Sequence, residues 1–308
     1  MNMATLSPRL CPKPYRNRCV SLPVRSHPCV GKIQEQLCKL RSMSEISWNS
    51  KTTILTCLSG LTGLYRCFDD LFKSSDIQQI LAQARHQILT NQLLEVSLKY
   101  LDVCSSAKDV AGKIKKNVLE LQSALRRSKK GGEICIDGDV NAYVGSRKEI
   151  KKEIARSLVL TKETEAITLE GFPLLREVNH QVSAMVKVMQ ETSDMSCVVF
   201  HSVLTFLSSP GVKPKHRGWG LVLKFVKKGA EGKGEKGFCH ELEAMEAELG
   251  KLVNEAETEE NEEHEKIQRA LVGSEAVESA MEELEEGLEG LFKAMIQARV
   301  SLLNILSI

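Results

Sequence analysis

Aromatic residues and prolines are scarce in this sequence of 308 residues. Tryptophan, tyrosine and phenylalanine together account for 5% of it, and five of its eight prolines lie before residue 30. β-Sheets are usually built from aromatic and β-branched residues, whereas this sequence is rich in Leu, Glu, Lys, Ala and Ser. The composition therefore predicts a mainly helical protein.

The sequence also lacks an apolar run long enough to span a membrane. The longest, from Cys197 to Leu207, is interrupted by His201, Ser202 and Thr205, whereas a transmembrane helix needs about 20 apolar residues. No apolar signal-peptide core opens the chain. We expect a soluble or peripherally attached protein.

No Cys-x-x-Cys pair occurs among the ten cysteines, which lie at irregular intervals: Cys11, Cys19, Cys29, Cys38, Cys57, Cys67, Cys104, Cys135, Cys197 and Cys239. Disulfide frameworks belong to short secreted chains. The pattern predicts reduced cysteines in an intracellular protein, and we expect a cytoplasmic location.

Acidic residues are missing before Glu35, while this region holds five prolines and the cations Arg9, Lys13, Arg16, Arg18 and Arg25. A packed helix is therefore disfavoured, and we predict a disordered basic tail over residues 1–28. Two alternatives stay open for the tail. It could be a plastid transit peptide, although its prolines weaken the required amphipathic helix, or it could contact anionic lipid at a membrane surface.

The formal net charge of +2 conceals an uneven distribution. Residues 241–289 carry eighteen Glu against Lys251, Lys266 and Arg269. We expect acidic and basic helices of one bundle to pair with each other, and an external charged partner is the alternative. Nucleic acid is disfavoured as a partner.

Apolar residues recur at alternating steps of three and four along two long stretches. The first contains Leu93, Val96, Tyr100, Val103, Ala107, Val110, Ile114, Asn117, Leu121 and Ala124; the second contains Val277, Met281, Leu284, Leu288, Leu291, Met295, Ala298, Leu302 and Ile305. Such heptad seams need partner helices to cover them. We predict an all-α fold, an elongated bundle of long amphipathic helices.

Further apolar stripes and breaks divide the rest of the chain. We expect helices over residues 30–41, 54–72, 140–158, 175–206 and 238–256. Ser75 and Gln78 suggest a capping box for a helix over residues 77–88, which either ends there or continues through the first seam as one helix of about fifty residues. Residues 29–308 then form a single helical domain with a flexible Lys/Gly-rich loop at 208–237.

Three polar or small residues interrupt the seams. Gly287 and Gly290 flank the second seam, where a helical glycine costs about 1 kcal/mol; either another helix approaches closely, or the glycines are exposed and tolerated. Asn117 lies within the first seam, where it is either buried to fix the register or placed at a water-exposed edge.

Few motifs indicate chemistry. Gly232-Lys233-Gly234-Glu235-Lys236-Gly237 matches the dinucleotide fingerprint, but no parallel sheet is predicted around it, and a flexible linker is the better interpretation. Cys197 and His201 are four residues apart, as two ligands of one metal could be, with Cys239 and His240 as further candidates. No dense Cys/His cluster accompanies them, so core or interface roles are favoured.

Basic residues also gather on one predicted helix: Arg147, Lys148, Lys151, Lys152 and Arg156. Glu149 and Glu153 lie within helical reach, so we favour a solvated ion-pair face over a phosphate site. We therefore predict no catalytic residue, no metal ligand and no cofactor.

Short motifs in a fixed order resemble those of a plant family, the BYPASS-related proteins, which is also described as a domain of unknown function. They are Ser21–Pro28, Glu35–Leu37 with Leu40 and Arg41, Gly63–Tyr65, Leu101–Asp109, Glu120–Arg127, Ser146–Lys148 and Arg299–Ser307. The resemblance runs from about residue 21 to residue 308.

The resemblance implies a plant protein linked to root and shoot development, and it supplies no catalytic residue. Our leading hypothesis is a non-enzymatic protein that presents helix faces to protein partners of unknown identity. One alternative is an enzyme or small-molecule carrier with a pocket inside the bundle. Another is a peripheral membrane protein that binds anionic lipid through its basic tail and Lys-rich loop.

Overall fold

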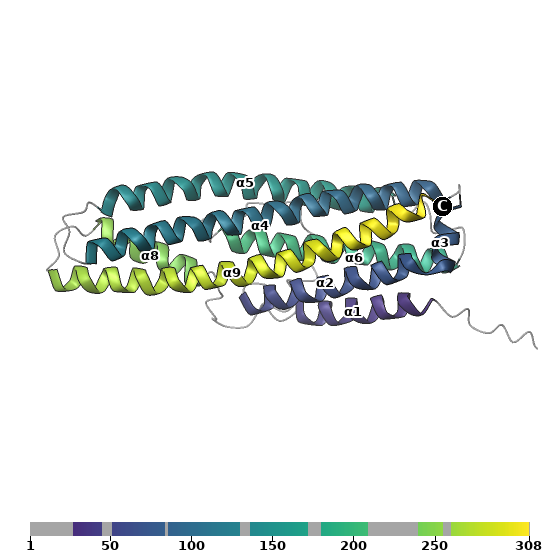
Figure 1. The fold of residues 1–308 in the computed structure, drawn as a ribbon, viewed down its shortest axis with the longest axis horizontal. Coiled ribbons are helices and arrows are strands. Elements are labelled where there is room, and N and C mark those ends of the chain that lie inside the picture. The colour runs from purple at the N-terminus through teal and green to yellow at the C-terminus, as the bar shows by residue number, and fades with distance from the viewer. Residues whose placement is uncertain are drawn as a thin grey trace, which may run out of the picture.

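The computed structural model describes residues 27–44, 51–83, 86–129, 136–171, 180–208, 240–254 and 260–307. Within these ranges every element is a helix: α1 (Pro28–Ser44), α2 (Lys51–Lys73), α3 (Ser75–Leu81), α4 (Gln87–Lys129), α5 (Ile136–Gly171), α6 (His180–Ser208), α8 (His240–Asn254) and α9 (Glu260–Ile305). The helices lie along a common long axis (Figure 1). The predicted all-α, elongated bundle is confirmed.

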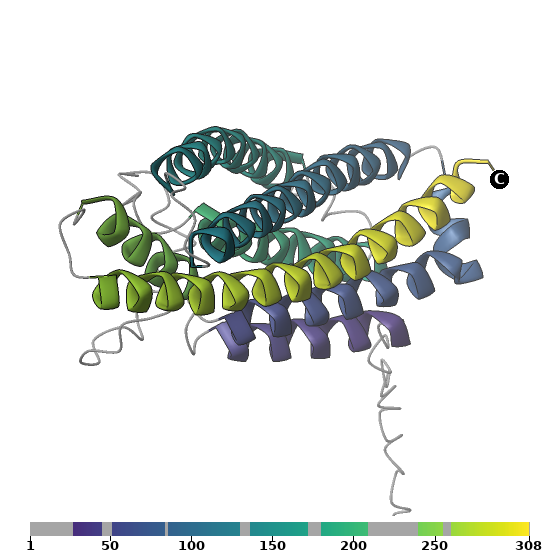
Figure 2. The same ribbon diagram turned by 60° about the vertical axis from the view of Figure 1, so that its left-hand side comes forward.

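The centre of the bundle is the contact between α4 and α9, which lie side by side in both ribbon views (Figures 1 and 2). Every residue of the predicted α9 seam is buried, from Val277 to Ile305. In the α4 seam, all residues are buried except Leu93 and Asn117, which are half-buried. α9 has 46 residues and so spans about 70 Å. Its other side packs along α2.

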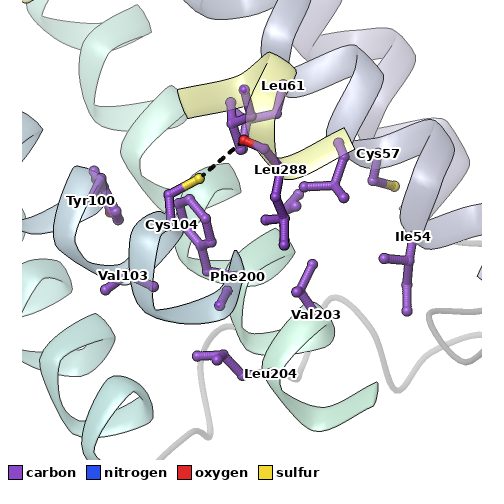
Figure 3. Packing of buried hydrophobic residues seen from close by; sticks show 14 of the residues in the cluster. Ile54, Cys57, Leu61, Tyr100, Val103, Cys104, Phe200, Val203, Leu204 and Leu288 are labelled. Atoms are coloured by element: carbon purple, nitrogen blue, oxygen red, sulfur yellow. Dashed lines mark hydrogen bonds between the residues drawn. The ribbon is translucent and has the colours of Figure 1, made fainter. Parts of the chain in front are cut away.

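Side chains from four helices meet in the middle of the core (Figure 3). Leu61 of α2 and Leu288 of α9 are fully buried there, as is Phe200 of α6. The ring of Phe200 stacks on Tyr100 of α4 with the centroids 5.9 Å apart. The Cys104 thiol of α4 donates a hydrogen bond to the Leu288 carbonyl, 3.5 Å away. This region therefore joins α2, α4, α6 and α9 into one apolar core.

Most helix boundaries agree with the sequence pattern. α1 begins at Pro28, a residue that is well suited to the first helical turn because its missing N–H would have no helical acceptor. α6 ends at Ser208, close to the expected end at residue 206, whereas α5 continues to Gly171, well beyond the expected end at residue 158. α5 begins at Ile136, before the expected start at residue 140.

The idea of one continuous helix through residues 77–124 is wrong, because α3 and α4 are separate. The backbone N–H of His86 bonds to the Gln83 carbonyl, and the His86 ring nitrogen Nδ1 lies 2.7 Å from the Ile80 carbonyl. These contacts satisfy groups that a continuous helix would have paired internally. The capping box is also absent, since Ser74 is the N-cap and makes no side-chain capping bond.

Glycines allow close approach at two helix contacts. A Cβ atom on Gly60 would lie 2.5 Å from Leu40 Cδ2, and one on Gly287 would lie 3.2 Å from Leu58 Cδ1. α2 therefore packs tightly on both α1 and α9. Open space surrounds Gly290, so close approach explains Gly287 and tolerance explains Gly290.

Some sequence predictions fall outside the described residues. These are the basic tail over residues 1–26, the loop at 209–237 with its Gly232–Gly237 fingerprint, and Cys239. The first residues of the helix expected over 175–206 also fall there, because residues 172–179 are not described. Among the helices that are described, none has a stretch both long and apolar enough to cross a membrane.

Candidate functional site

The end of the bundle near the α9 C-terminus carries apolar side chains on its outer surface. Three of them are spaced by four and three residues on α9, on the face opposite the buried seam, and a fourth lies on α4: Ile296 (40% exposed), Val300 (42%), Leu303 (41%) and Leu98 (48%). We call these four residues the outer stripe. α9 thus has two apolar faces at this end, and only one of them is covered by the described helices.

Arg299 joins the two helices of the outer stripe. Its guanidinium donates hydrogen bonds to the Leu94 carbonyl and to Ser97 Oγ, the latter at 2.6 Å. Leu98 follows Ser97 directly and lies one turn from Leu94. Arg299 therefore ties α9 to α4 at the end of the bundle where both helices carry exposed apolar residues.

Ion pairs join α9 to its neighbours farther along the bundle. Glu289 lies 2.8 Å from Lys108, and this hydrogen bond holds the pKa of Glu289 below its usual value. Further pairs are Lys115–Glu285, Arg126–Glu275 at 3.2 Å, Lys51–Glu283 at 2.9 Å and Arg269–Glu248 at 3.2 Å. Pairing between basic helices and the Glu-rich segment is therefore confirmed. The paired side chains are partly exposed, so each contributes little stability.

A buried network of hydroxyl groups connects α4, α5 and α6. Tyr100 donates a hydrogen bond to the Ser193 carbonyl at 2.9 Å, and its oxygen lies 2.7 Å from Ser193 Oγ and 3.0 Å from Cys197 Sγ. Thr168 of α5 lies 2.9 Å from Ser193 Oγ and donates to the Thr164 carbonyl. We call Tyr100, Thr168, Ser193 and Cys197 the hydroxyl network. The polar atoms of these four side chains are therefore paired within the core, as buried polar groups usually are.

The thiols of the core are poor nucleophiles. Burial raises the pKa of Cys197 and of Cys104 to about 12, and it raises that of Cys57 to about 11. Since the thiolate is the reactive form, these cysteines are chemically inert at neutral pH. Cys197 is a core residue, as favoured from the sequence, and His201 is half-buried on the same helix. Within the described residues there is no group of three or more potential metal ligands.

Two carboxyl groups come together where α5 faces α6. Burial raises the pKa of Asp194 to about 6, and the negative charge of Glu165 adds to this shift. Burial also raises the pKa of Glu165. Arg41 of α1 pairs with Glu191 at 3.4 Å and partly opposes the shift at Asp194. A raised carboxyl pKa can support proton transfer, but neither acid lines the cavity among α2, α4, α6 and α9 or the cavity between α5 and α8.

The cavity among α2, α4, α6 and α9 has a volume of about 70 Å³ and a mostly apolar lining that includes Tyr65, Tyr100 and Met295. Ligand-binding pockets usually measure roughly 300–1,000 Å³. This space can therefore hold only a very small molecule. It offers little support for an enzyme active site at the centre of the bundle.

A larger cavity of about 370 Å³ lies between α5 and α8, and basic residues of the predicted ion-pair face line it. For Lys152, the solvated ion-pair interpretation is confirmed, because it pairs with Glu149 at 2.8 Å. For Arg147 the interpretation is wrong. Its side chain is buried and pairs with Glu246 of α8, at 2.9 Å. No local sequence pattern indicated this contact, because the partner of Arg147 lies 99 residues away.

Asn117 has a partner on another helix. Its side-chain nitrogen donates a hydrogen bond to Ser146 Oγ of α5, 2.6 Å away. The residue is half-buried and therefore lies at the edge of the seam. This contact links α4 to α5 beside the apolar core.

Comparison with known proteins identifies the family of the chain. A family model described as Protein BPS1 matches residues 57–305. No curated protein and no solved structure matches the chain. The matched region extends from α2 to the last residue of α9 and agrees with the resemblance of its short motifs to BYPASS-related proteins. The chain belongs to the Protein BPS1 family.

Proposed function

We propose that the protein is a non-enzymatic interaction protein of plant root and shoot development, which binds protein partners through its outer stripe. The exposed stripe on α9 and α4 is the observation that carries this proposal. Its four- and three-residue spacing is the pattern with which one helix packs on another. The expected partner is an amphipathic helix laid along α4 and α9. The developmental role rests on the family alone.

The chemistry of the core supports a non-enzymatic role. The buried thiols have pKa values far above neutral pH, and the central cavity is too small for most metabolites. Hydroxyl groups in the core bond to one another and to backbone carbonyls, which stabilises the fold. These features are those of a scaffold, whose exposed faces carry its function.

Proximity labelling in plant root tissue tests the proposal. We expect a reproducible set of protein neighbours around the wild type, and loss of most of them when Ile296 and Val300 are both replaced by Glu. Val159→Glu is the matched control, because Val159 is an exposed apolar residue of α5, away from the stripe. Identical neighbours for all three proteins would contradict a role for the stripe. Thermal unfolding of each variant shows whether the fold is intact.

The same experiment addresses location. Immunoblotting of a C-terminal tag reveals whether the N-terminus is cleaved, and a cleaved protein with only plastid neighbours would replace the expected cytoplasmic location. The membrane alternative depends on residues outside the described ranges and predicts salt-sensitive binding to anionic vesicles. Absence of vesicle binding at low salt would eliminate it.

A further inference from the structure

The cavity between α5 and α8 combines charge with an apolar wall. The cationic side chains of Arg147, Lys148 and Lys151 line it, opposite a single carboxylate, that of Glu246. Val140, Val144 and Leu249 supply apolar surface, and Asn141 and Tyr143 add polar groups. Its volume of about 370 Å³ falls within the range of small-molecule sites.

Arg147 is the residue that makes this cavity unusual. Only 3% of its surface is exposed. Its Nε donates to Glu246 Oε1 at 2.9 Å, and its Nη2 donates to the Leu207 carbonyl at 3.2 Å. The third nitrogen, Nη1, is buried and has no hydrogen-bond acceptor among the described residues. A buried donor without a partner costs about 1–3 kcal/mol, and more when the group is charged.

The two lysines of the cavity are also without acidic partners. No carboxylate of the described helices lies within ion-pair distance of Lys148 or Lys151, whereas neighbouring Lys152, which does not line the cavity, pairs with Glu149. Tyr143 donates its hydroxyl proton to Glu246, at 3.3 Å, and so helps to hold the carboxylate against Arg147. Among the described residues that line the cavity, cations therefore outnumber carboxylates, and all of these cations belong to α5.

We propose that the cavity between α5 and α8 binds a small organic anion, with its oxyanion on Arg147, Lys148 and Lys151 and its apolar part against Val140, Val144 and Leu249. A carboxylate or phosphate oxygen accepts hydrogen bonds from guanidinium and ammonium groups and is therefore complementary to these donors. The apolar wall favours an anion with a hydrocarbon part over inorganic phosphate. This site is distinct from the outer stripe, and its existence does not depend on the proposed protein partner.

Fluorescence titration with 1-anilinonaphthalene-8-sulfonate tests the charged half of the site. The probe carries one sulfonate on an apolar body. We expect Lys148→Gln and Lys151→Gln each to weaken its binding by about three- to tenfold. Lys152→Gln is the matched control and should bind the probe as the wild type does. Equal affinity in Lys151→Gln, Lys152→Gln and the wild type would overturn the proposal.

Competition and blocking variants test the apolar half. Octyl phosphate should displace the probe, and octanol, which has the same hydrocarbon chain without the oxyanion, should not. Val144→Trp places a large ring at the exposed edge of the cavity and should weaken binding more than about tenfold. Ala142→Trp, on an exposed position outside the cavity, should not. Displacement by octanol as effective as that by octyl phosphate, or equal binding by the two Trp variants, would refute an anion site here.

Discussion

α4 is held by two neighbours in different ways. Toward α9 it presents a mainly apolar seam, with ion pairs such as Lys108–Glu289 at the partly exposed edge. Toward α6 it presents Tyr100, whose hydroxyl lies among the polar atoms of Ser193 and Cys197. The first contact depends on apolar burial, which is strong but tolerates sliding of the helices. The second depends on directional hydrogen bonds, which define one relative position.

The difference predicts how each contact responds to mutation. A substitution in an apolar seam lowers the free energy of unfolding by an amount that depends on the change in side-chain volume and on any charge that it buries. A hydrogen-bonded contact contributes only about 0.5–1.5 kcal/mol per bond. Removing one partner, however, leaves the other polar group in the core without a hydrogen bond. The predictions below separate these two types of contact, beginning with the largest effect.

Leu288→Lys should have the largest effect. Leu288 is fully buried between α2 and α4, and no Asp or Glu is fully buried among the described residues, so the new ammonium group would lack an acidic partner there. We expect a loss of at least about 4 kcal/mol of unfolding free energy, enough to abolish a marginal fold. Thermal unfolding followed by circular dichroism measures this. Glu286→Lys, on the exposed side of the same helix, should unfold like the wild type.

If Leu288→Lys retained the wild-type midpoint of thermal unfolding, the α9 seam would not be structural. In that case α9 could dissociate from α4 without loss of the remaining bundle. We expect this variant to lose partner binding only together with its fold.

Tyr100→Phe tests the hydroxyl network and should have an intermediate effect. The substitution removes the hydroxyl but keeps the ring that stacks on Phe200. We expect a loss of about 1–3 kcal/mol, because the Ser193 carbonyl and the neighbouring polar groups lose a partner in the core. Denaturant unfolding gives the value. Tyr65→Phe is the comparison, since Ser196, which faces Tyr65, also bonds to the Thr192 carbonyl.

We expect the Tyr65 variant to lose less than the Tyr100 variant. Equal and negligible losses would show that the network is not needed for stability. The α4–α6 contact would then depend on apolar packing in the same way as the α4–α9 contact.

Asp194→Asn should produce a smaller, stabilising effect that depends on pH. The pKa of Asp194 is raised to about 6 by burial first and Glu165 second, so the folded protein binds this proton more tightly than the unfolded chain does. The wild type should therefore lose stability as the pH rises from about 4 to about 6. Because Asn carries no charge, the variant should be more stable than the wild type above pH 6, by about 1–2 kcal/mol after solvent screening.

Denaturant titrations at pH 4 and pH 7 measure this difference. The two proteins should have nearly equal stability at the lower pH, where Asp194 is protonated. A stabilisation by Asn that is the same at both values of pH would show that the charge of Asp194 is not its cause.

Regular apolar repetition made the burial of both seams predictable, but it did not indicate that α4 and α9 would cover each other. Residues of both seams, such as Val103 and Leu284, are buried where the three-four spacing placed them. The break between α3 and α4 was missed because it depends on bonds from His86 to Ile80 and Gln83 rather than on a proline or glycine.

Contacts between distant polar residues could not be predicted in the same way. Arg147 looks like its exposed neighbours in the sequence, and only α6 and α8 together make its burial favourable. Thr192 and Ser196 gave α6 a polar middle, but their bonds to carbonyls one turn earlier became evident only in the folded chain. The outer stripe shares its spacing with a buried seam, and solvent exposure alone distinguishes the two.

The late position of α9 in the sequence has a consequence for biosynthesis. Leu58 of α2 and Cys104 of α4 both rest on α9, and the pair Cys104 and Leu288 is separated by 184 residues. On the ribosome, the apolar faces of α2 and α4 therefore stay uncovered until α9 has emerged. Apolar surface that stays exposed for this long can associate with other nascent chains. Demand for chaperones should consequently be greatest late in synthesis, and a premature stop codon before residue 260 should yield an aggregating product.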